Sequence, residues 1–464
     1  MKHPTICHYV FLVVFSLAFL ATTVPASGNN GARPNIVFIM IDDLGWMDLA
    51  CQGNQLVETP NIDRFAKQGI RFTNAYAAAP VCSPTRASIL TGISPAELKI
   101  TNHTPDRASF TPENSQLQPA KMLNHLPAEH TTIAEHLKQA GYKTGFIGKW
   151  HLSGPGRGEP EFEPTAQGFD LNIAGCGFGG PPTFFDPYRI PHLENRKQGE
   201  YLPDRLTDES IKFIRQHQSS PFMLFLWNYT VHWPMEAPDA LLKKYETRTG
   251  PGLNDTRYGA MIEAMDRSIG KLLDEIDRLK LTDNTLVVFT SDNGGFDGVA
   301  DNRPLRKAKG YLYEGGIRVP LMMRWPKKVK PNQLCQTPVI SMDHFPTLLD
   351  VAGIEISQQP RHRVATSLLP LLTQEKSLER DAIYFHYPNF AWHRSNRLGS
   401  AVRSGKYKLI ERFDDNSVEL YDLDSDLSET NDLSQTLPKI ADKLKRKLHA
   451  WRKATNAELP SPKT

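Results

Sequence analysis

Continuous apolar runs alternate with helically patterned segments, and this alternation constrains the fold more than any other feature of the chain. Runs such as 35–41 (NIVFIMI), 221–229 (PFMLFLWNY) and 285–290 (TLVVFT) are typical of strands buried on both faces. Two shorter runs predict further strands at 142–147 and 319–324. Helices are expected at 59–67, 131–140, 206–217 and 255–281. The βαβα order predicts an α/β sandwich around a mostly parallel sheet.

Local signals predict where some helices begin and end. Thr59 is expected to cap the helix 59–67, with Pro60 at its first position. Gly141 is expected to end the helix 131–140. The Gly- and Pro-rich stretch 153–187 predicts a long irregular loop, and such loops in compact domains are usually functional.

The pattern changes at about residue 355. Short strands separated by turns are expected at 382–386, 400–402, 407–411 and 419–422, followed by a lysine-rich helix at 438–451. We therefore predict a catalytic domain at 27–354 and a smaller α+β domain with an antiparallel sheet at 355–464.

The first 26 residues have the pattern of a secretory signal. Lys2 and His3 precede the apolar run 9–20, and Val24-Pro25-Ala26 follows as a small-residue cleavage site. The run is short for a membrane span, although an uncleaved anchor is the alternative. We expect an exported protein, secreted or periplasmic, without stable membrane association.

Charge and cysteine usage exclude some classes of protein. The net charge is +3, with 54 basic and 51 acidic residues, so nothing indicates a nucleic-acid-binding surface. Beyond the signal, four cysteines remain in a long chain, which is not a disulfide framework; they are Cys51, Cys82, Cys176 and Cys335. The sequence leaves open whether Cys51, Cys176 and Cys335 form a disulfide.

Polar clusters follow four of the predicted strands. They are Asp42-Asp43, Lys149-Trp150-His151, His232-Trp233-Pro234 and Asp292-Asn293. Ligand sites in open α/β sheets form at the carboxyl ends of the strands, so parallel strands would bring the four clusters to one edge. Any one cluster could be a simple turn, and only the coincidence of four indicates a site.

Oxygen donors dominate two of these clusters. Asp42, Asp43, Asp292 and Asn293 supply three carboxylates and an amide oxygen. Hard donors of this kind suit Ca²⁺ or Mg²⁺ rather than Zn²⁺. A solvated acidic turn is the alternative for either pair alone.

The segment Cys82-Ser83-Pro84-Thr85-Arg86 precedes a helical run. Pro84 is expected at the first helical position, which places Cys82 at a helix N-terminus where backbone N–H groups favour an anion. Arg86 is one turn further and can point to the same place. The alternative is a small buried thiol beside a helix cap.

These motifs, in this order, resemble the type I, formylglycine-dependent sulfatases of the alkaline phosphatase superfamily. The similar segments are RPNIVFIMIDDLGWMDLACQGN, CSPTRASILTG, GKWHL, VHWP, SDNGG, KGYLYEGGIRVP, AVRSGKYKLI and VELYDL. They span nearly the whole chain after the signal. One departure is that Leu427 follows Asp426 where the family often has Asp-Pro, which puts only a C-terminal turn in doubt.

The resemblance implies a mechanism for cleaving sulfate esters. A separate formylglycine-generating enzyme would oxidise Cys82 to an aldehyde, whose hydrate supplies the nucleophile. Ca²⁺, in preference to Mg²⁺, would contact position 82 and four oxygen ligands. Those ligands are Asp42, Asp43, Asp292 and Asn293.

The resemblance also implies roles for the other polar residues. Arg86 would lower the cost of an alkoxide, and Asp292 would accept the nucleophile's proton. Lys149 and Lys309 would neutralise sulfate oxygens, although Lys307 lies close to Lys309 in sequence. His232, with Lys309, would protonate the leaving oxygen. His151 would act as the base that regenerates the aldehyde.

A sulfated carbohydrate is the expected substrate, either a polysaccharide or a glycosaminoglycan. Specificity is expected in the loops 101–130, 175–192 and 386–397. His386, His393 and Arg394 are candidate sugar or sulfate contacts, with ordinary surface residues as the alternative. A phosphate or phosphonate ester hydrolase of the same superfamily, and a non-catalytic glycan-binding relic, are the other functions that this pattern allows.

Overall fold

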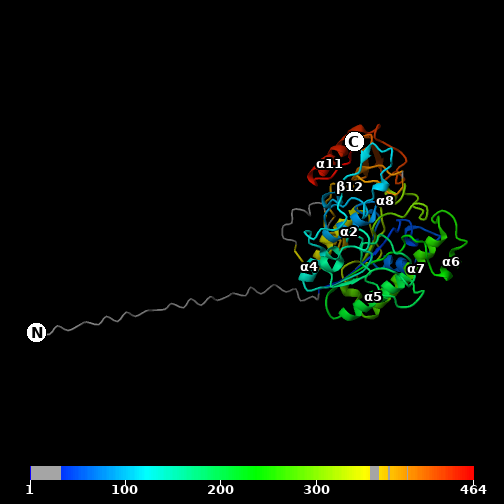
Figure 1. Cartoon of the computed structure of the whole chain (residues 1–464), viewed down its shortest axis with the longest axis vertical. Coiled ribbons are helices and arrows are strands. Elements are labelled where there is room, and N and C mark those ends of the chain that lie inside the picture. Colours follow the sequence, from blue (N-terminus) through cyan, green and yellow to red (C-terminus); the bar gives the residue numbers. More distant parts are fainter. Residues whose placement is uncertain (2–32, 356–364, 375–376, 394, 464) are drawn as a thin grey trace. The chain divides into compact units, whose positions relative to one another are not determined.

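The computed structural model describes Met1 and residues 33–355, 365–374, 377–393 and 395–463. The predicted signal segment, apart from Met1, and Arg394 lie outside these residues. Helices and strands are numbered in chain order, and several of them are labelled in Figure 1.

An eight-stranded sheet forms the centre of the structure. Its strands, in spatial order, are β10 (Gln333–Cys335), β2 (Ile70–Phe72), β9 (Leu321–Arg324), β8 (Thr285–Ser291), β1 (Asn35–Ile41), β7 (Phe222–Trp227), β5 (Lys143–Gly148) and β6 (Leu171–Ile173). Strand β9 runs antiparallel to β2 and β8, and every other pair is parallel. The predicted mostly parallel sheet is therefore confirmed.

Helices cover both faces of this sheet. Alternate side chains of a strand point to opposite faces, so Val37 and Ile39 join one apolar core while Ile36 and Phe38 join the other. The first core contains residues of α1 (Pro60–Lys67), α5 (Leu202–His217), α6 (Asp239–Tyr245) and α7 (Thr256–Arg278). The second contains residues of α2 (Cys82–Thr91), α4 (Ile133–Gln139) and α9 (His344–Val351). Figure 1 shows α5, α6 and α7 grouped apart from α2 and α4.

A separate four-stranded antiparallel sheet follows, as predicted. Its strands are β12 (Ile383–Tyr387), β13 (Gly399–Ser404), β14 (Tyr407–Arg412) and β15 (Val418–Asp422). Helix α11 (Pro438–Ala454) packs on it through an apolar face that includes Leu444 and Leu448 (Figure 1). The domain boundary at 354–355 stays a prediction, because residues 356–364 are outside the described part of the chain.

Short elements complete the fold. Two small pairings join distant segments, β3 (Ala75–Tyr76) with β11 (Val339–Ile340) and β4 (Leu117–Gln118) with β16 (Ser461–Pro462). The short helices are α3 (Pro95–Leu98), α8 (Glu314–Ile317) and α10 (Leu369–Leu372). The loop expected at 153–187 is interrupted by the edge strand β6, which the glycine- and proline-rich sequence did not indicate.

Two helix starts differ from the prediction in detail. Helix α1 begins at Pro60, but the Thr59 hydroxyl accepts a hydrogen bond from the Ala50 N–H at 3.0 Å instead of capping the helix. Helix α2 begins at Cys82, so Pro84 is its third residue and not its first. The expected stop after α4 is confirmed, because Gly141 adopts φ 88°, in the left-handed region that favours glycine.

A buried ionic cluster ties the antiparallel sheet to helix α8. Lys408 of β14 contacts Glu314 of α8 at 2.9 Å and Glu429 at 2.8 Å, and all three side chains are fully buried. Arg318 reaches Glu314 from the other side at 2.7 Å. Buried charges of this kind tolerate little displacement, so the cluster holds α8 in place against β14.

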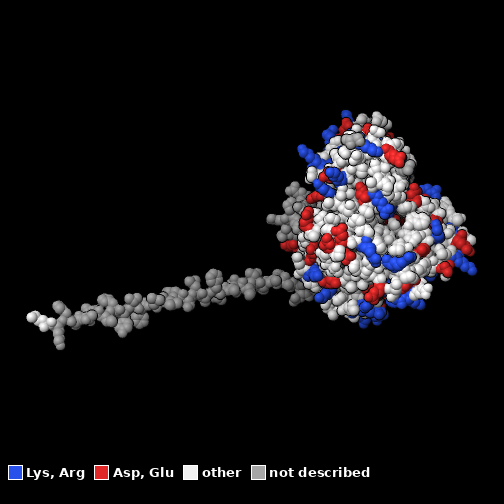
Figure 2. Space-filling model, viewed as in Figure 1, with Lys and Arg blue, Asp and Glu red and all other residues white. Residues whose placement is uncertain are grey.

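The surface mixes both signs of charge. On the face shown in Figure 2, basic and acidic side chains are interspersed. In the part of the chain that the structure describes, the helices lack the combination of length and apolar character that a bilayer span requires.

His344 generates a prediction about stability and pH. Its ring packs edge-on against Phe38 with centroids 4.9 Å apart, and burial lowers its pKa from 6.5 to about 3. Below pH 6.5 the unfolded state therefore binds a proton at His344 that the native state does not bind. The contribution of His344 to the free energy of unfolding is fully present above pH 6.5 and is lost as the pH falls toward 3. Between pH 8 and pH 5 this histidine should remove about 2 kcal/mol of unfolding free energy.

The check is urea unfolding of the wild type and of His344→Gln at both pH values. The variant should lose about 2 kcal/mol less than the wild type over this interval. Parallel losses in the two proteins would show that His344 does not titrate on unfolding in this range.

Candidate active site

The four polar clusters predicted at strand ends do meet at one edge of the sheet. Strands β8, β1, β7 and β5 are consecutive and parallel, with Ile41 beside Ser291 and Met40 beside Trp227. Asp42, Asp292 and Lys149 follow directly, and His232 lies on the turn after β7. The convergence expected from sequence is thus a consequence of the parallel pairing.

The acidic residues of β1 and β8 are linked to each other. Asp43 adopts φ 63°, and its backbone N–H donates to Asp292 Oδ1 at 3.2 Å. Its Oδ1 accepts a hydrogen bond from Asn293 Nδ2 at 2.8 Å. One potential ligand atom from each of Asp42, Cys82 and Asp292 lies within 4.8 Å of the others. These groups form a single compact donor cluster.

Three buried cations balance the three carboxylates. Arg86 donates to Asp292 Oδ2 through Nε at 2.9 Å and Nη2 at 2.7 Å. Lys149 Nζ donates to both oxygens of Asp42, at 2.8 and 2.7 Å. Lys309 Nζ donates to Asp43 Oδ2 at 2.8 Å. None of these side chains is more than 4% exposed, so each charge depends on its partner for compensation.

The cluster fits a hard divalent cation. Asn293 Oδ1 is buried and has no hydrogen-bond partner among the described residues, which leaves a polar atom free to bind a ligand. Carboxylate and amide oxygens suit Ca²⁺, whereas the Cys82 sulfur is the one soft atom in the group.

Cys82 is the first residue of α2 and is 2% exposed. Burial raises the pKa of its thiol to about 11, despite the positive charges of Lys149 and Lys309. Reactive cysteines have thiols with lowered pKa values, because the thiolate is the nucleophile. An unmodified Cys82 is therefore protonated and weakly nucleophilic at neutral pH.

The two histidines of the site are neutral at pH 7. Burial and the charge of Lys149 hold the pKa of His151 well below its usual range, and its Nε2 faces the Thr104 carbonyl oxygen. Burial also lowers the pKa of His232 to about 3, a shift that Asp43 opposes and Lys309 reinforces. His232 Nε2 lies 3.7 Å from Asp43 Oδ2.

The carboxylates differ in ionisation. Burial, reinforced by Asp292 and Asp43, raises the pKa of Asp42 well above its usual range, although Lys149 lowers it. Burial opposes the charged form of Asp43, but Lys309 and His232 outweigh it, so its pKa lies below the usual range. Arg86 and Lys149 likewise overcome burial and lower the pKa of Asp292.

The ambiguity between Lys307 and Lys309 is resolved by geometry. Lys309 contacts Asp43, whereas the Lys307 ammonium lies 5.2 Å from the centre of the Tyr311 ring. Only Lys309 reaches the cluster.

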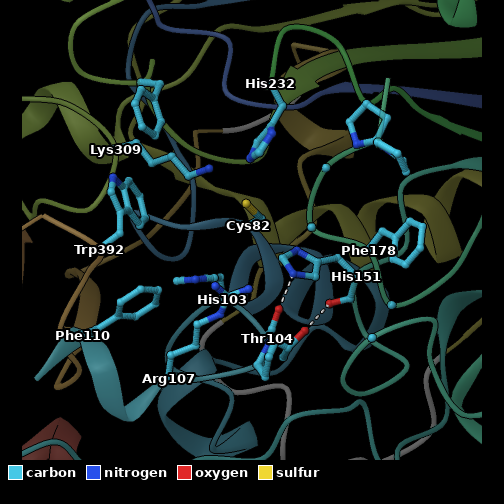
Figure 3. Close-up of a pocket in the computed structure, with 18 residues that line it drawn as sticks. Cys82, His103, Thr104, Arg107, Phe110, His151, Phe178, His232, Lys309 and Trp392 are labelled. Carbon is cyan, nitrogen blue, oxygen red and sulfur yellow. Dashed lines mark hydrogen bonds between the residues drawn. The ribbon is translucent and has the colours of Figure 1, made fainter. Parts of the chain in front are cut away.

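A cavity of about 590 Å³ opens onto this cluster. Figure 3 shows Cys82 between His151, His232 and Lys309, with aromatic side chains around them. Residues of all three loops expected to carry specificity line the cavity. Among them are His103 and Arg107 from the first, Phe178 from the second and Trp392 from the third.

Several cavity residues were not singled out from the sequence. They are His103, Arg107, Phe110, Phe178, Phe296 and Trp392. No motif surrounds them, and the only available signal was the clustering of aromatic and basic residues in long loops.

The candidate substrate contacts of the second domain need correction. His386 is 1% exposed, its ring nitrogens lie 2.7 Å from Ser400 Oγ and 2.8 Å from the Glu458 carbonyl oxygen, and it does not line the cavity. It is a packing residue, because strand β12 directs it toward α11. His393 stacks on Tyr311 with ring centroids 4.4 Å apart and is not among the described residues that line the cavity. Arg394 lies outside the described residues. Cys51, Cys82, Cys176 and Cys335 are all free.

Comparisons with known proteins identify the family. A family model described as sulfatase matches residues 34–354, and one described as N-sulphoglucosamine sulphohydrolase, C-terminal, matches residues 307–454. A sulfatase of Formosa agariphila is 30% identical over 92% of this chain and 90% of its own length. The N-acetylgalactosamine-6-sulfatase of Mus musculus is 33% identical over 88% of this chain and 76% of its own length.

A solved structure gives the same result. Ps i-CgsB in complex with k-i-k-neocarrahexaose has 29% sequence identity and a TM-score of 0.76, and the match covers 90% of this chain and 93% of that one. The structural match and the match of the sulfatase family model therefore both cover most of this chain. The chain belongs to the sulfatase family, within the alkaline-phosphatase-like superfamily, and is a sulfuric ester hydrolase.

Proposed function

We propose that this enzyme removes sulfate from a sulfated carbohydrate and that its nucleophile is a formylglycine made from Cys82. The carbohydrate class is supported by the names of the relatives, which include an N-acetylgalactosamine-6-sulfatase and a protein crystallised with a neocarrahexaose. The wide cavity lined by aromatic residues also suits a sugar, whose C–H faces pack against rings.

The environment of Cys82 is the observation that carries the proposal. Its sulfur lies in the donor cluster with Asp42 and Asp292, at the start of a helix, and faces the cavity. A thiol with a pKa near 11 is poorly suited to attack an ester. Conversion to an aldehyde would replace the soft sulfur by oxygen, which matches the hard donors around it.

We also propose that Asp42, Asp43, Asp292 and Asn293 hold Ca²⁺, in preference to Mg²⁺. When bound, the cation would supply positive charge that polarises a sulfate oxygen and favours ionisation of a hydroxyl at position 82. Each of the three acidic side chains is already paired with a buried cation, so an added divalent ion would give the site an excess of positive charge. That excess favours an anionic sulfate ester.

The basic side chains have separate tasks in this proposal. Arg86 holds Asp292 through two hydrogen bonds and keeps it oriented toward position 82. Lys149 and Lys309 would neutralise the sulfate oxygens. Lys309 lines the cavity, and Lys149 is buried beside it through its ion pair with Asp42. Asp292 would accept the proton of the nucleophilic hydroxyl, although its lowered pKa makes it a weak base.

Two histidines would transfer the remaining protons. His232 faces the cavity and is assigned as the acid that protonates the leaving oxygen. It is neutral in the free enzyme, and a bound anionic ester would raise its pKa. His151 would be the base that restores the aldehyde after sulfate release. Its Nδ1 is buried without a partner among the described residues, so it is free to accept a proton.

Maturation and location complete the proposal. A formylglycine-generating enzyme would act on Cys82 before it is buried in α2. Export to the periplasm or beyond is supported by the signal-like pattern of residues 1–26.

The modification is tested by mass spectrometry and activity together. Peptides of active protein should show a loss of about 18 Da at Cys82, the mass difference between a thiol and an aldehyde. Cys82→Ala should abolish release of sulfate from sulfated oligosaccharides, whereas Cys51→Ser, at a half-buried cysteine outside the cavity, should retain it. An active enzyme with wholly unmodified Cys82 would refute the mechanism.

Calcium binding is tested by calorimetry on metal-stripped protein. Wild type should bind Ca²⁺ and gain thermal stability, because a ligand that binds only the native state stabilises it. Asn293→Ala should weaken binding about tenfold or more, a loss of about 1.4 kcal/mol. Asn284→Ala is the matched control, since Asn284 precedes the same strand at its opposite end. Full activity of the stripped wild type, with no calcium bound, would be contrary to the proposal.

The general-acid role is tested with two leaving groups. A phenolate leaves without help and a sugar alkoxide does not, so His232→Ala should reduce kcat/KM for a sugar sulfate ~10²–10⁴-fold and for an aryl sulfate much less. Lys149→Met should affect both substrates similarly, because they share the same sulfate oxygens. Equal losses for His232→Ala on the two substrates would make it a sulfate-positioning residue.

A further inference from the structure

Arg107 is a cation of the cavity that lacks a carboxylate partner. Its side chain lines the cavity, and in the described part of the chain it forms no ion pair. Lys309, by contrast, is paired with Asp43. Figure 3 shows Arg107 extending from the cavity wall toward His103, on the same side as Phe110.

The neighbouring carboxylate is already occupied. Asp106 Oδ1 accepts a hydrogen bond from Asn102 Nδ2 at 2.9 Å, and its Oδ2 accepts one from Asn389 Nδ2 at 3.1 Å. Both oxygens are therefore turned to the base of the loop, and the adjacent acid does not neutralise Arg107.

The loop that carries Arg107 is firmly anchored. Thr101 Oγ1 donates to Asn389 Oδ1 at 2.7 Å, and Asn102 Nδ2 donates to the Phe390 carbonyl oxygen at 3.0 Å. The Tyr387 hydroxyl donates to Asn102 Oδ1 at 3.1 Å. These contacts fix the loop from which the exposed Arg107 side chain extends, so less order has to be imposed on the backbone when a ligand arrives.

The surroundings of Arg107 favour an anion. No aspartate or glutamate is among the described residues that line the cavity. The Arg107 guanidinium lies 5.9 Å from the centre of the Phe110 ring, and that ring lies 5.3 Å from the His103 ring. Burial, together with the charges of Lys309, Lys149 and Arg107, lowers the pKa of His103 to about 3, so this wall carries a neutral imidazole beside an unpaired guanidinium.

We infer that Arg107 binds a second acidic group of the glycan, a carboxylate or a second sulfate, while the ester to be cleaved lies at Cys82. A guanidinium presents a planar set of N–H donors that matches two oxygens of either group. The inference rests on the proposed function, since it assigns specificity within the same cavity. It makes Arg107 a specificity-determining residue.

The experiment compares three substrates that share one sulfate ester. They are an N-acetylgalactosamine 6-sulfate monosaccharide, the same sugar joined to a uronic acid, and the same sugar with an additional 4-sulfate. Initial rates of 6-sulfate release give kcat/KM for wild type, Arg107→Gln and Arg107→Lys. Arg446→Gln is the matched control, because it removes an equal charge from an exposed site on α11, away from the cavity.

Arg107→Gln should lower kcat/KM for at least one of the two doubly charged substrates by about ten- to a hundredfold more than for the monosulfate, the usual range for a hydrogen bond to a charged group. The substrate that suffers the greater loss identifies the acidic group as carboxylate or sulfate. Arg107→Lys should restore part of the difference, and Arg446→Gln should match the wild type on all three.

Equal losses on the three substrates, or none, would overturn the inference while leaving the sulfatase function intact. Absence of 6-sulfate release by the wild type is a different result. The comparison would then be repeated with two carrageenan oligosaccharides. One carries a second sulfate on the neighbouring sugar, and the other lacks that sulfate. If neither carbohydrate were hydrolysed while an aryl sulfate was, the proposed carbohydrate substrate would be wrong, and Arg107 would lose its assigned ligand with it.

Discussion

The burial of three carboxylates beside three cations is the constraint on which the structure depends. Asp42, Asp43 and Asp292 are fully buried at the ends of β1 and β8, where an unpaired charge would be very costly. Their partners come from three other places: Arg86 from α2, Lys149 from the end of β5 and Lys309 from the loop before α8. Removing one partner of such a pair typically costs about 3–5 kcal/mol, so these segments must meet in one arrangement.

The same arrangement separates the chemistry from the recognition of substrate. The reactive groups follow rigid parallel strands or begin a buried helix, which fixes their positions closely. The cavity above them is built from loops, which can vary without disturbing the sheet. The antiparallel sheet joins the two parts, because Lys408 holds α8 through Glu314 and the segment after β12 contributes Trp392 to the cavity.

Regular elements of the sheet could be predicted because each has a local signal. The runs at 35–41 and 285–290 are apolar throughout, as expected for strands covered on both faces, and they form β1 and β8. The direction of β9 could not be predicted, because an apolar run does not specify whether its partner is parallel. Pro84 was misplaced by two positions because Cys82 and Ser83 carry no sequence signal that extends a helix before a proline.

By itself the sequence determined the order of the motifs, the strands that they follow and the candidate nucleophile, since these depend on residues close together in the chain. Only the tertiary structure decided that His103 and Arg107 share a cavity wall with Trp392, and that His386 is buried against the end of the chain. The physical reason is that these contacts join residues far apart in the sequence. Asp106 and Asn389, for example, are 283 positions apart, and His386 and Glu458 are 72 positions apart. A loop residue faces the cavity or the core according to what packs beneath it, and local sequence does not record that packing.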